Sequence, residues 1–590
     1  MINTVPPGFI FIIGALFIPI IKNRNLKCGY LLLLPFISFI NLIHIPVGTH
    51  FTVGFLDYTL VFAKVDRLSL LFGYVFHLIT VIAIIYALHV KDDLQHVAGY
   101  VYGGAALGVT FAGDLISLFV FWEMLTIGSV FLIWARRTQK SLDAGFRYAL
   151  VHIVGGLILL AGILMHIHST GSVEFTYIGL KNGNLGTYLI FFGFGINCAW
   201  PILHPWLTDA YPEATITGVI FLSAFTTKTA VYVLARAFPG TSMLIWIGAL
   251  MTMFPIFYAV IENDLRRVLA YSLINQVGFM VCGIGIGTHL AINGAVSHAF
   301  NDIIFKALLF MSVGAVMYRT GKVNATDLGG LYKSMPLTCI FCIVGAASIS
   351  AFPLFSGFVS KSMVMSAASM GGMSIIWFML LFASAGVFHH AGIKIPFFAF
   401  FSHDSGIRTK EAPLNMLIAM GIAAFLCIFI GTFPEYSVYR LLPFTDVVYH
   451  PYTPTHIMAQ TQLLFFSALA FTLLLLSGIY PSELRAINLD ADLIYRKGSR
   501  LLVYVVTETA GAIARAADFV FIKLLPVKLA AFSKQPVSGF MSKMRPANPG
   551  AAKSSTGATL ETETLLPAGV PVLIAVAFLM ILAFVFLKVI

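Results

Sequence analysis

The sequence has few charged residues and few cysteines for its length. Only 10% of its 590 residues are charged, whereas soluble domains carry about 25%. Its six cysteines lie almost entirely in apolar stretches, where a thiol behaves as a small hydrophobic side chain. Cys339 and Cys342 have CxxC spacing without a second pair or a histidine nearby, so we expect no metal site. These shortages exclude a soluble enzyme, a disordered chain and a secreted disulfide scaffold.

Hydrophobic residues make up 59% of the chain and gather in long runs. About sixteen runs approach or exceed the length that crosses a bilayer. We therefore predict an all-α polytopic membrane protein. The predicted spans are 8–21, 29–46, 68–89, 97–112, 115–134, 148–167, 187–203, 216–238, 243–261, 268–287, 290–317, 337–365, 374–402, 413–433, 460–480 and 568–588.

Lys and Arg are distributed unevenly between the connections of these spans. One set of connections holds most of them, including Arg136, Arg137, Arg266 and Arg267, and the other holds few. Because cytoplasmic loops are enriched in basic residues, we place the first set in the cytoplasm and the N-terminus outside. Basic cytoplasmic loops also explain the net charge of +11 better than nucleic-acid binding does.

The region after Pro481 differs from the rest of the chain. Charges from Arg496 to Lys523 interrupt an apolar stretch regularly, which is typical of an amphipathic helix at a membrane interface. A linker rich in Pro, Ser, Gly and Thr follows. The predicted segments are a transmembrane core (1–440), an additional transmembrane helix and connection (441–489), a lateral amphipathic helix on the cytoplasmic side (490–532), the linker (533–567) and a C-terminal transmembrane anchor (568–590).

Ionisable side chains occur inside several of the apolar spans. Each costs about 2.5 to 3.5 kcal/mol to insert into a bilayer, so each is a candidate for function. Pairing that only holds helices together is the alternative, and it is favoured for Lys394 near a predicted cytoplasmic end. The candidates for a proton path are Glu123, Lys228, His298, Asp302, Lys306 and Lys361, with Asn197 and Lys394 as further relay candidates.

The pattern of these candidates favours proton transfer. His298, Asp302 and Lys306 are spaced four apart, which puts them along one face of a helix. Burial disfavours the charged form of such groups, and an approaching opposite charge restores it. Groups of this kind can therefore load and release protons when a neighbour moves.

Two spans contain predicted helix breaks. Pro201 and Pro205 interrupt one, and Pro353 with Gly357 interrupts another. Irregular backbone at membrane depth survives only where it is buried in protein or lines a hydrated cavity. A pair of interrupted helices therefore indicates a transport path.

Several motifs together resemble those of a known family. They include FWEMLTIGS around Glu123, FTTKTAVYVLAR around Lys228, IIFKALLFMSVGAV around Lys306 and SAFPLFSGFVSKSMV around Lys361, within roughly residues 60–430. The chain resembles the antiporter-like membrane subunits shared by respiratory complex I and multisubunit Mrp Na⁺/H⁺ antiporters, most of all the D-type subunits of Mrp. The C-terminal extension is similar in outline to that of the distal subunit of complex I.

The resemblance implies a fourteen-helix antiporter-like core with two broken helices and a proton path across the middle of the membrane. Glu123, Lys228, Lys306 and Lys361 match the family's essential acidic and basic positions, and His298 matches a polar one. The implied protein has no cofactor, metal or catalytic site of its own.

The chain departs from the family pattern at two positions. Asn197 stands where the family usually has a lysine that partners the glutamate, so either Lys228 partners Glu123 instead, which we favour, or Asn197 acts as a hydrogen-bond relay with water. Asp302 stands where many members have histidine, and we expect a local ion pair with Lys306.

The leading hypothesis is a proton- or cation-translocating subunit of a multisubunit antiporter or complex I-like assembly in a prokaryotic inner membrane. Its expected partners are other membrane subunits, lipid and H⁺, with Na⁺ or K⁺ left open, and no nucleic acid. A stand-alone secondary solute/H⁺ transporter and a haem-binding redox membrane protein are the alternatives. The 16 histidines show no clear facing pairs for haem.

The family resemblance predicts that Asn197→Lys is structurally tolerated. The variant should insert and accumulate to the wild-type level, because related chains carry lysine there. Immunoblots of isolated membranes would measure this. Loss of the protein from the membrane would contradict the alignment of this segment.

Overall fold

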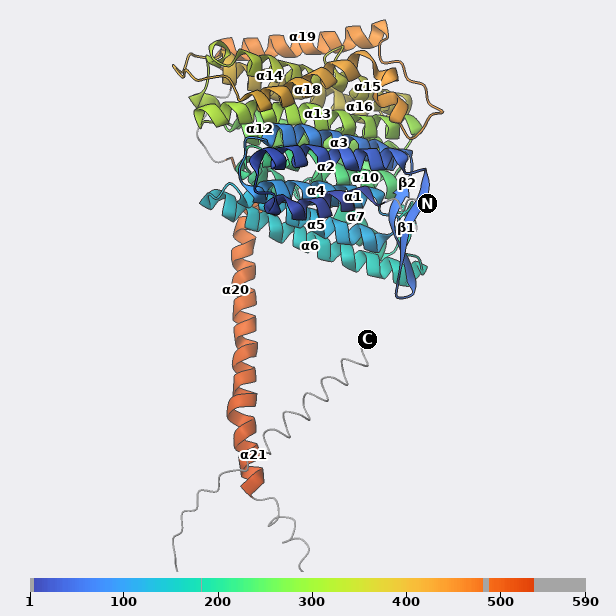
Figure 1. Cartoon of the computed structure of the whole chain (residues 1–590), viewed down its shortest axis with the longest axis vertical. Coiled ribbons are helices and arrows are strands. Elements are labelled where there is room, and N and C mark those ends of the chain that lie inside the picture. The colour runs from blue at the N-terminus through green and yellow to red at the C-terminus, as the bar shows by residue number, and fades with distance from the viewer. Residues whose placement is uncertain (1–4, 182, 481–487, 535–590) are drawn as a thin grey trace, which may run out of the picture. The chain divides into compact units, whose positions relative to one another are not determined.

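The computed structural model describes residues 5–181, 183–480 and 488–534. The chain forms two units, Met1–Gly498 and Ser499–Ile590. In the first unit long helices lie side by side in layers, with α6 (Gln139–Thr170) and α19 (Pro454–Leu476) at opposite edges (Figure 1). Its other helices are α1 Pro7–Phe17, α2 Arg24–His44, α3 Arg67–Ala87, α4 Asp93–Phe111, α5 Leu115–Trp134, α7 Leu185–Asn197, α8 Pro205–Ala210, α9 Gly218–Ala224, α10 Thr226–Ala237, α11 Ser242–Ile261, α12 Leu265–Ile286, α13 His289–Thr320, α14 Pro336–Ile349, α15 Ser356–Met370, α16 Ser374–Val387, α17 Lys394–Pro396 and α18 Leu414–Thr432.

The helices confirm an all-α membrane protein. Among the described residues, eleven helices are long and apolar enough to cross a membrane. Each predicted span up to 460–480 corresponds to a helix or to consecutive helices. Further along, α20 (Asp492–Ala517) and α21 (Leu525–Lys534) cover the predicted lateral helix. The predicted linker from residue 535 onwards and the anchor span 568–588 lie outside the described residues.

A β-hairpin precedes α3, in a connection for which the sequence pattern predicted no strand. Strand β1 (Gly48–Phe55) pairs antiparallel with β2 (Tyr58–Val65) at one end of the helical layers (Figure 1). Asp114 fastens the hairpin to the core, because its carboxylate accepts a hydrogen bond from the Val61 N–H at 2.6 Å.

Both predicted helix breaks are present, and a third was missed. The first separates α7 from α8, and the second separates α14 from α15. The third lies at Phe225, between α9 and α10, in a stretch without proline or glycine. It falls three residues before Lys228, inside the span predicted as continuous.

The core contains one helical arrangement twice. Asp114 caps the start of α5 and Asp264 caps the start of α12. Helices α6 and α13 both have 32 residues and both end at a left-handed glycine, Gly171 (φ 70°) and Gly321 (φ 69°). A glycine takes this conformation without the clash of a Cβ atom. Equivalent positions in these helices therefore differ by 150 in residue number.

The helix break that follows is repeated as well. In the first copy Ala199 and Ile202 have φ of 58° and 73°, and in the second Ala351 and Leu354 have φ of 58° and 74°. Positive φ is uncommon for residues with a side chain, so the match is specific. The two halves of the core thus use the same backbone to position different side chains.

Close helix packing predicts that Gly248→Ala destabilises the core. A Cβ atom there would overlap the backbone nitrogen of Cys282 and lie 2.7 Å from the Gly278 carbonyl oxygen, so α11 and α12 would have to separate. We expect a loss of about 1 to 3 kcal/mol, measured as a lower melting temperature in detergent. Gly29→Ala is the control, because nothing lies within 4 Å of its added Cβ. Equal melting temperatures for both variants would contradict the prediction.

Candidate functional site

Lys228 and Asp302 form a buried ion pair between α10 and α13. Lys228 Nζ lies 2.5 Å from Asp302 Oδ2, and both side chains are fully buried. Lys228 also donates to the Ser223 carbonyl at 2.9 Å, across the break at Phe225. The break thus frees a carbonyl that the ammonium group binds.

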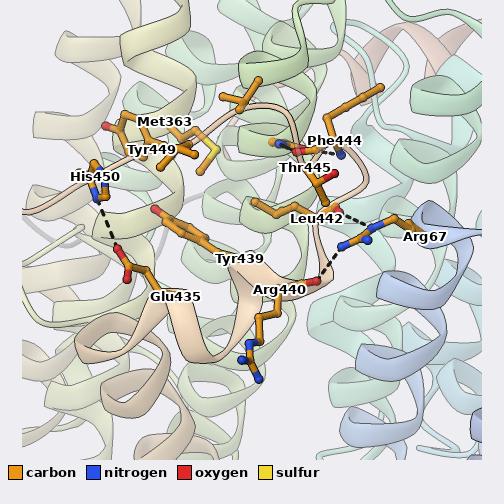
Figure 2. Close-up of a pocket in the computed structure, with 13 residues that line it drawn as sticks. Arg67, Met363, Glu435, Tyr439, Arg440, Leu442, Phe444, Thr445, Tyr449 and His450 are labelled. Atoms are coloured by element: carbon orange, nitrogen blue, oxygen red, sulfur yellow. Dashed lines mark hydrogen bonds and ion pairs between the residues drawn. The ribbon is translucent and has the colours of Figure 1, made fainter.

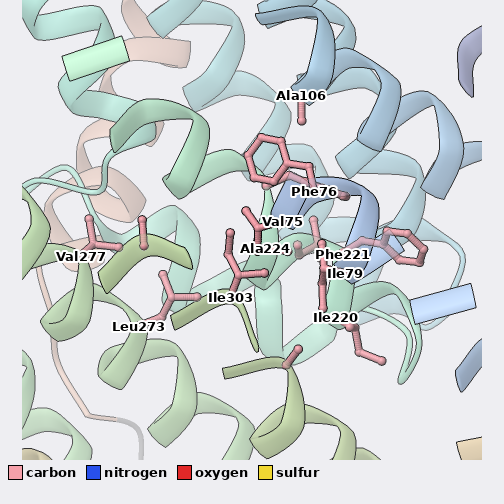
Figure 3. Close-up of a cluster of buried hydrophobic side chains, with 14 of the residues drawn as sticks. Val75, Phe76, Ile79, Ala106, Ile220, Phe221, Ala224, Leu273, Val277 and Ile303 are labelled. Atoms are coloured by element: carbon pink, nitrogen blue, oxygen red, sulfur yellow. The ribbon is translucent and has the colours of Figure 1, made fainter. Parts of the chain in front are cut away.

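Apolar side chains surround this region. Figure 3 shows Phe76, Ile79, Ile220, Leu273 and Ile303 packed together from α3, α9, α12 and α13. A low-dielectric wall of this kind strengthens each electrostatic interaction inside it and makes an unpaired charge expensive.

Lys306 does not pair with Asp302, so the expected local ion pair is wrong. Its Nζ donates instead to Ser272 Oγ on α12 at 2.9 Å. Asp302 is turned towards α10, where Lys228 provides the closer partner. The spacing of four residues placed both groups on one face of α13 but could not show that a neighbouring helix competes for the carboxylate.

His298 lies between α12 and α15. Its Nε2 is 3.1 Å from Gln276 Oε1, and its Nδ1 is 2.9 Å from Ser360 Oγ. The Gln276 amide NH₂ donates to Asn275 at 2.6 Å, which leaves Oε1 to accept from the imidazole. A neutral His298 therefore donates through Nε2 and accepts from Ser360 through Nδ1.

Lys361 binds the second helix break. Its Nζ donates to the carbonyl of Ile349, the last residue of α14, at 3.0 Å. It also lies 4.9 Å from the centre of the Phe279 ring. The negative end of α14 and the face of an aromatic ring both favour a cation at this place.

Lys394 is buried at the end of α11. Its Nζ donates to the carbonyls of Ala259, Val260 and Glu262 at 3.2, 2.6 and 2.7 Å. These contacts hold the C-terminal end of α11 to the π-helical region around α17. The geometry fits the structural role that the sequence favoured for this residue.

Glu123 is not paired with Lys228, so the favoured pairing is wrong. The Glu123 side chain is half-buried, and its Oε1 has no hydrogen-bond partner among the described residues. Val120 and Ile127, on the same side of α5, are 48% and 54% exposed. Glu123 therefore lies beside an apolar surface of the core.

Asn197 bonds to a residue that the sequence motifs did not mark. Its Oδ1 lies 2.9 Å from Nδ1 of His152 on α6, and both side chains are buried. His152 falls inside the predicted span 148–167. Its place in an apolar run, four residues after Tyr148, was the available signal.

A second missed group ties the start of the C-terminal extension to the core. The Asp490 carboxylate lies 3.0 Å from His204 Nε2 and accepts a hydrogen bond from Tyr271 at 2.7 Å. Burial raises the pKa of Asp490, but these hydrogen bonds outweigh it and keep the pKa below its ordinary value.

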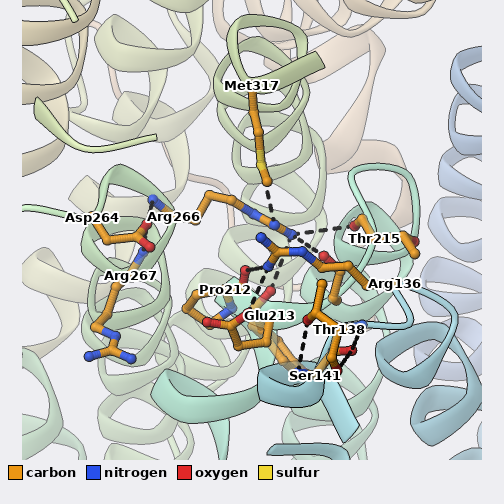
Figure 4. Close-up of polar contacts among 12 residues, drawn as sticks. Arg136, Thr138, Ser141, Pro212, Glu213, Thr215, Asp264, Arg266, Arg267 and Met317 are labelled. Atoms are coloured by element: carbon orange, nitrogen blue, oxygen red, sulfur yellow. Dashed lines mark hydrogen bonds and ion pairs between the residues drawn. The ribbon is translucent and has the colours of Figure 1, made fainter. Parts of the chain in front are cut away.

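Arginines predicted to lie in cytoplasmic connections also make internal contacts (Figure 4). Arg266 is buried and donates to the carbonyls of Ala214 and Thr215 at 2.9 and 3.3 Å. Arg136 donates to Glu213 at 2.9 Å. These contacts fix the chain that follows the first break.

A cavity of about 420 Å³ lies beside the beginning of α13 (Figure 2). Asn293 on α13 and Met363 on α15 line it, five and two residues from His298 and Lys361. The chain after α18 covers it and is held by Arg67, which donates to the Leu442 carbonyl at 3.0 Å.

Comparisons with known proteins agree with the sequence motifs. The family described as NADH:quinone oxidoreductase/Mrp antiporter, transmembrane, matches residues 112–389. The A subunit of a Na⁺/H⁺ antiporter from Alkalihalophilus pseudofirmus is 29% identical over 72% of this chain and 61% of its own length. A putative antiporter subunit mnhD2 from Staphylococcus aureus is 26% identical over 54% of this chain and 69% of its length.

The fold also matches a solved membrane complex. A chain of the membrane-bound sulfane sulfur reductase, an archaeal respiratory membrane complex, superposes with a TM-score of 0.69 at 22% identity, covering 90% of this chain and 99% of that one. The present chain aligns with only 61% of the length of the Alkalihalophilus pseudofirmus relative. Residues 112–389 therefore match the antiporter-like membrane family that NADH:quinone oxidoreductases and Mrp antiporters share, as the sequence motifs predicted.

Proposed function

We propose that this chain moves protons across a membrane as the cation/proton-translocating subunit of a multisubunit complex. The observation that carries the proposal is the buried Lys228–Asp302 pair with further lysines close to it. Asp302 interacts electrostatically with Lys306 and Lys361 as well. Three lysine amines thus share one carboxylate in an apolar interior.

Such a cluster cannot hold all of its charges at once. Uncompensated charge in a low-dielectric interior is strongly disfavoured, and the described residues of the cluster supply no second carboxylate. The number of bound protons therefore depends on which lysine Asp302 approaches. Movement of Asp302 between its neighbours would release a proton from one amine and bind a proton at another.

Polar side chains lead from this pair towards the cavity beside α13. Along α13 the order towards the cavity is Lys306 with Ser272, then Asp302, then His298 with Gln276 and Ser360, and Lys361 follows Ser360 on α15. Water within the cavity could exchange protons with this end of the series. We place the cavity on the outer face and the basic connections in the cytoplasm, following the distribution of Lys and Arg.

The relatives suggest the setting of this activity. One is a subunit of a Na⁺/H⁺ antiporter, and another belongs to an archaeal respiratory complex. We propose that other membrane subunits pack against apolar surfaces such as the one beside Glu123, in a prokaryotic inner membrane. H⁺ is the proposed cargo, with Na⁺ or K⁺ as the exchanged ion. Segments 1–440 and 441–489 are the proposed core and its added helix, and 490–532 the proposed lateral helix.

Removing the charged group of Glu123 or of Lys228 should abolish transport. Glu123→Ala and Lys228→Ala should each eliminate ion-dependent proton movement while the protein remains assembled with its partners. Fluorescence quenching by a pH-gradient dye in membrane vesicles measures this. The exposed Glu174→Ala and Lys322→Ala are controls that should transport normally. Full transport by both Glu123→Ala and Lys228→Ala would contradict the proposed path.

Variants of the buried ion pair should distinguish its contribution to stability from its contribution to transport. Asp302→Asn leaves the Lys228 ammonium without its partner, and breaking such a pair costs about 3 to 5 kcal/mol. The double variant Lys228→Met/Asp302→Leu should recover most of the melting temperature, because apolar side chains replace both charges, yet it should not transport. A transporting double variant would show that the pair is only structural.

A further inference from the structure

We propose that His152 is the proton-carrying partner of Glu123 in the first half of the core. This inference rests on the proposed function and adds a residue that the family motifs did not mark. In this arrangement His152 accepts the proton that Glu123 releases and passes it on towards Lys228. Asn197 orients the imidazole and carries no charge itself.

His152 is built into a specific position. His152 is 1% exposed, and the centre of its ring lies 4.2 Å from the Tyr148 ring, tilted by 38°, and 4.5 Å from the Trp206 ring. Nδ1 contacts Asn197 Oδ1 at 2.9 Å, whereas Nε2 has no hydrogen-bond partner among the described residues. A buried, unpartnered ring nitrogen is costly, which indicates a use for it.

The internal repeat gives His152 a counterpart. Equivalent positions in α6 and α13 differ by 150, so His152 corresponds to Asp302. Asp302 is the carboxylate to which Lys228 binds. The two halves therefore hold a titratable side chain at the same place on the same helix.

One turn after His152, α6 has no charged side chain at the position that corresponds to Lys306, and Glu123 of α5 supplies a charge there. Gly156 corresponds to Lys306, and a Cβ atom on Gly156 would overlap the Glu123 carboxylate. The glycine thus makes room for a charged group from α5 where α13 supplies its own lysine. In the second half an acidic side chain, Asp302, lies one turn from a basic one, Lys306. In the first half a basic side chain, His152, lies one turn from the place occupied by an acidic one, Glu123.

The proton balance follows from the hydrogen bonds. The Asn197 carbonyl oxygen accepts the Nδ1–H of neutral His152, which leaves the lone pair on Nε2. The Glu123 O–H bond breaks and an N–H bond forms at Nε2, giving a carboxylate and an imidazolium. Gly156 is four residues, or about 6 Å, from His152 along α6, and we assign the transfer between the two groups to intervening water. Release of the Nε2 proton restores the neutral ring.

Hydroxyl groups lie between His152 and the central ion pair. Tyr148, which contacts the His152 ring, donates to Ser129 at 2.9 Å and lies beside Thr226. Thr226 Oγ1 is 2.6 Å from the Tyr102 hydroxyl and two residues from Lys228. The released proton therefore has a route towards α10.

The test combines loss with rescue in vesicles that contain the whole complex. His152→Gln should lower ion-dependent proton transport about a hundredfold, because a glutamine cannot be protonated. His152→Phe keeps the ring contacts with Tyr148 and Trp206 and should lose transport equally. His152→Gln/Asn197→Lys should recover most of the transport, since the new amine occupies the place of the group that bonds His152. Asn197→Lys alone should be impaired, because its ammonium opposes the imidazolium.

His77→Gln is the matched control. His77 is also buried, but its ring nitrogens contact Ser38 at 2.8 Å and the Gly73 carbonyl at 2.7 Å, outside the proposed path. This variant should transport like the wild type. Normal transport by His152→Gln, or its loss without rescue by Asn197→Lys, would overturn the role of His152. Absence of ion-dependent transport in the wild-type complex would instead reject the proposed function itself.

Discussion

An ammonium group buried in a membrane needs oxygen atoms to replace water, and in this protein helix ends provide many of them. Lys361 and Lys394 bind carbonyls at the ends of α14 and α11, and Lys228 binds one across the break in α9–α10. A continuous helix has no such free carbonyls in its middle. The breaks therefore provide oxygen atoms for lysines at membrane depth, and Lys228 adds the Asp302 carboxylate to its carbonyl contact.

The order of the helices could be predicted from the sequence because lipid requires long apolar runs. The two proline-containing breaks were equally visible, since proline removes a backbone hydrogen bond wherever it occurs. The break at Phe225 carries no such residue, and its visible feature is the contact of Lys228 with the Ser223 carbonyl on the other side of the break. The hairpin before α3 was missed because its pattern was hidden between two strong apolar signals.

The candidate site was predictable in composition but not in pairing. Glu123, Lys228, Asp302 and Lys306 were recognised because a charge in an apolar run is conspicuous. Their partners depend on which helices are neighbours, and the sequence does not contain that directly. His152 was overlooked because one histidine in an apolar span is a weak signal. The capping aspartates and the left-handed glycines of the two halves are each spaced by 150 residues. This sequence pattern could have identified His152 as the counterpart of Asp302.

The two copies of the repeated backbone carry polar side chains of different types. The second copy holds two lysines, Lys306 and Lys361, and the Asp302 carboxylate that binds Lys228 of α10, whereas the first uses a glutamate, an imidazole and an amide. Gly156 shows how such a difference can arise, because removing one side chain lets a neighbouring helix provide the charge.

Asp490, at the start of the C-terminal extension, is bonded to the core. Its carboxylate is held at once by His204, next to the first helix break, and by Tyr271, the neighbour of the serine that binds Lys306. A truncation before this residue would uncover two buried polar groups at the junction of the two repeats. Asp490 is thus part of the packing of the core. A truncation that removes it would change the core itself, and not only the C-terminal extension.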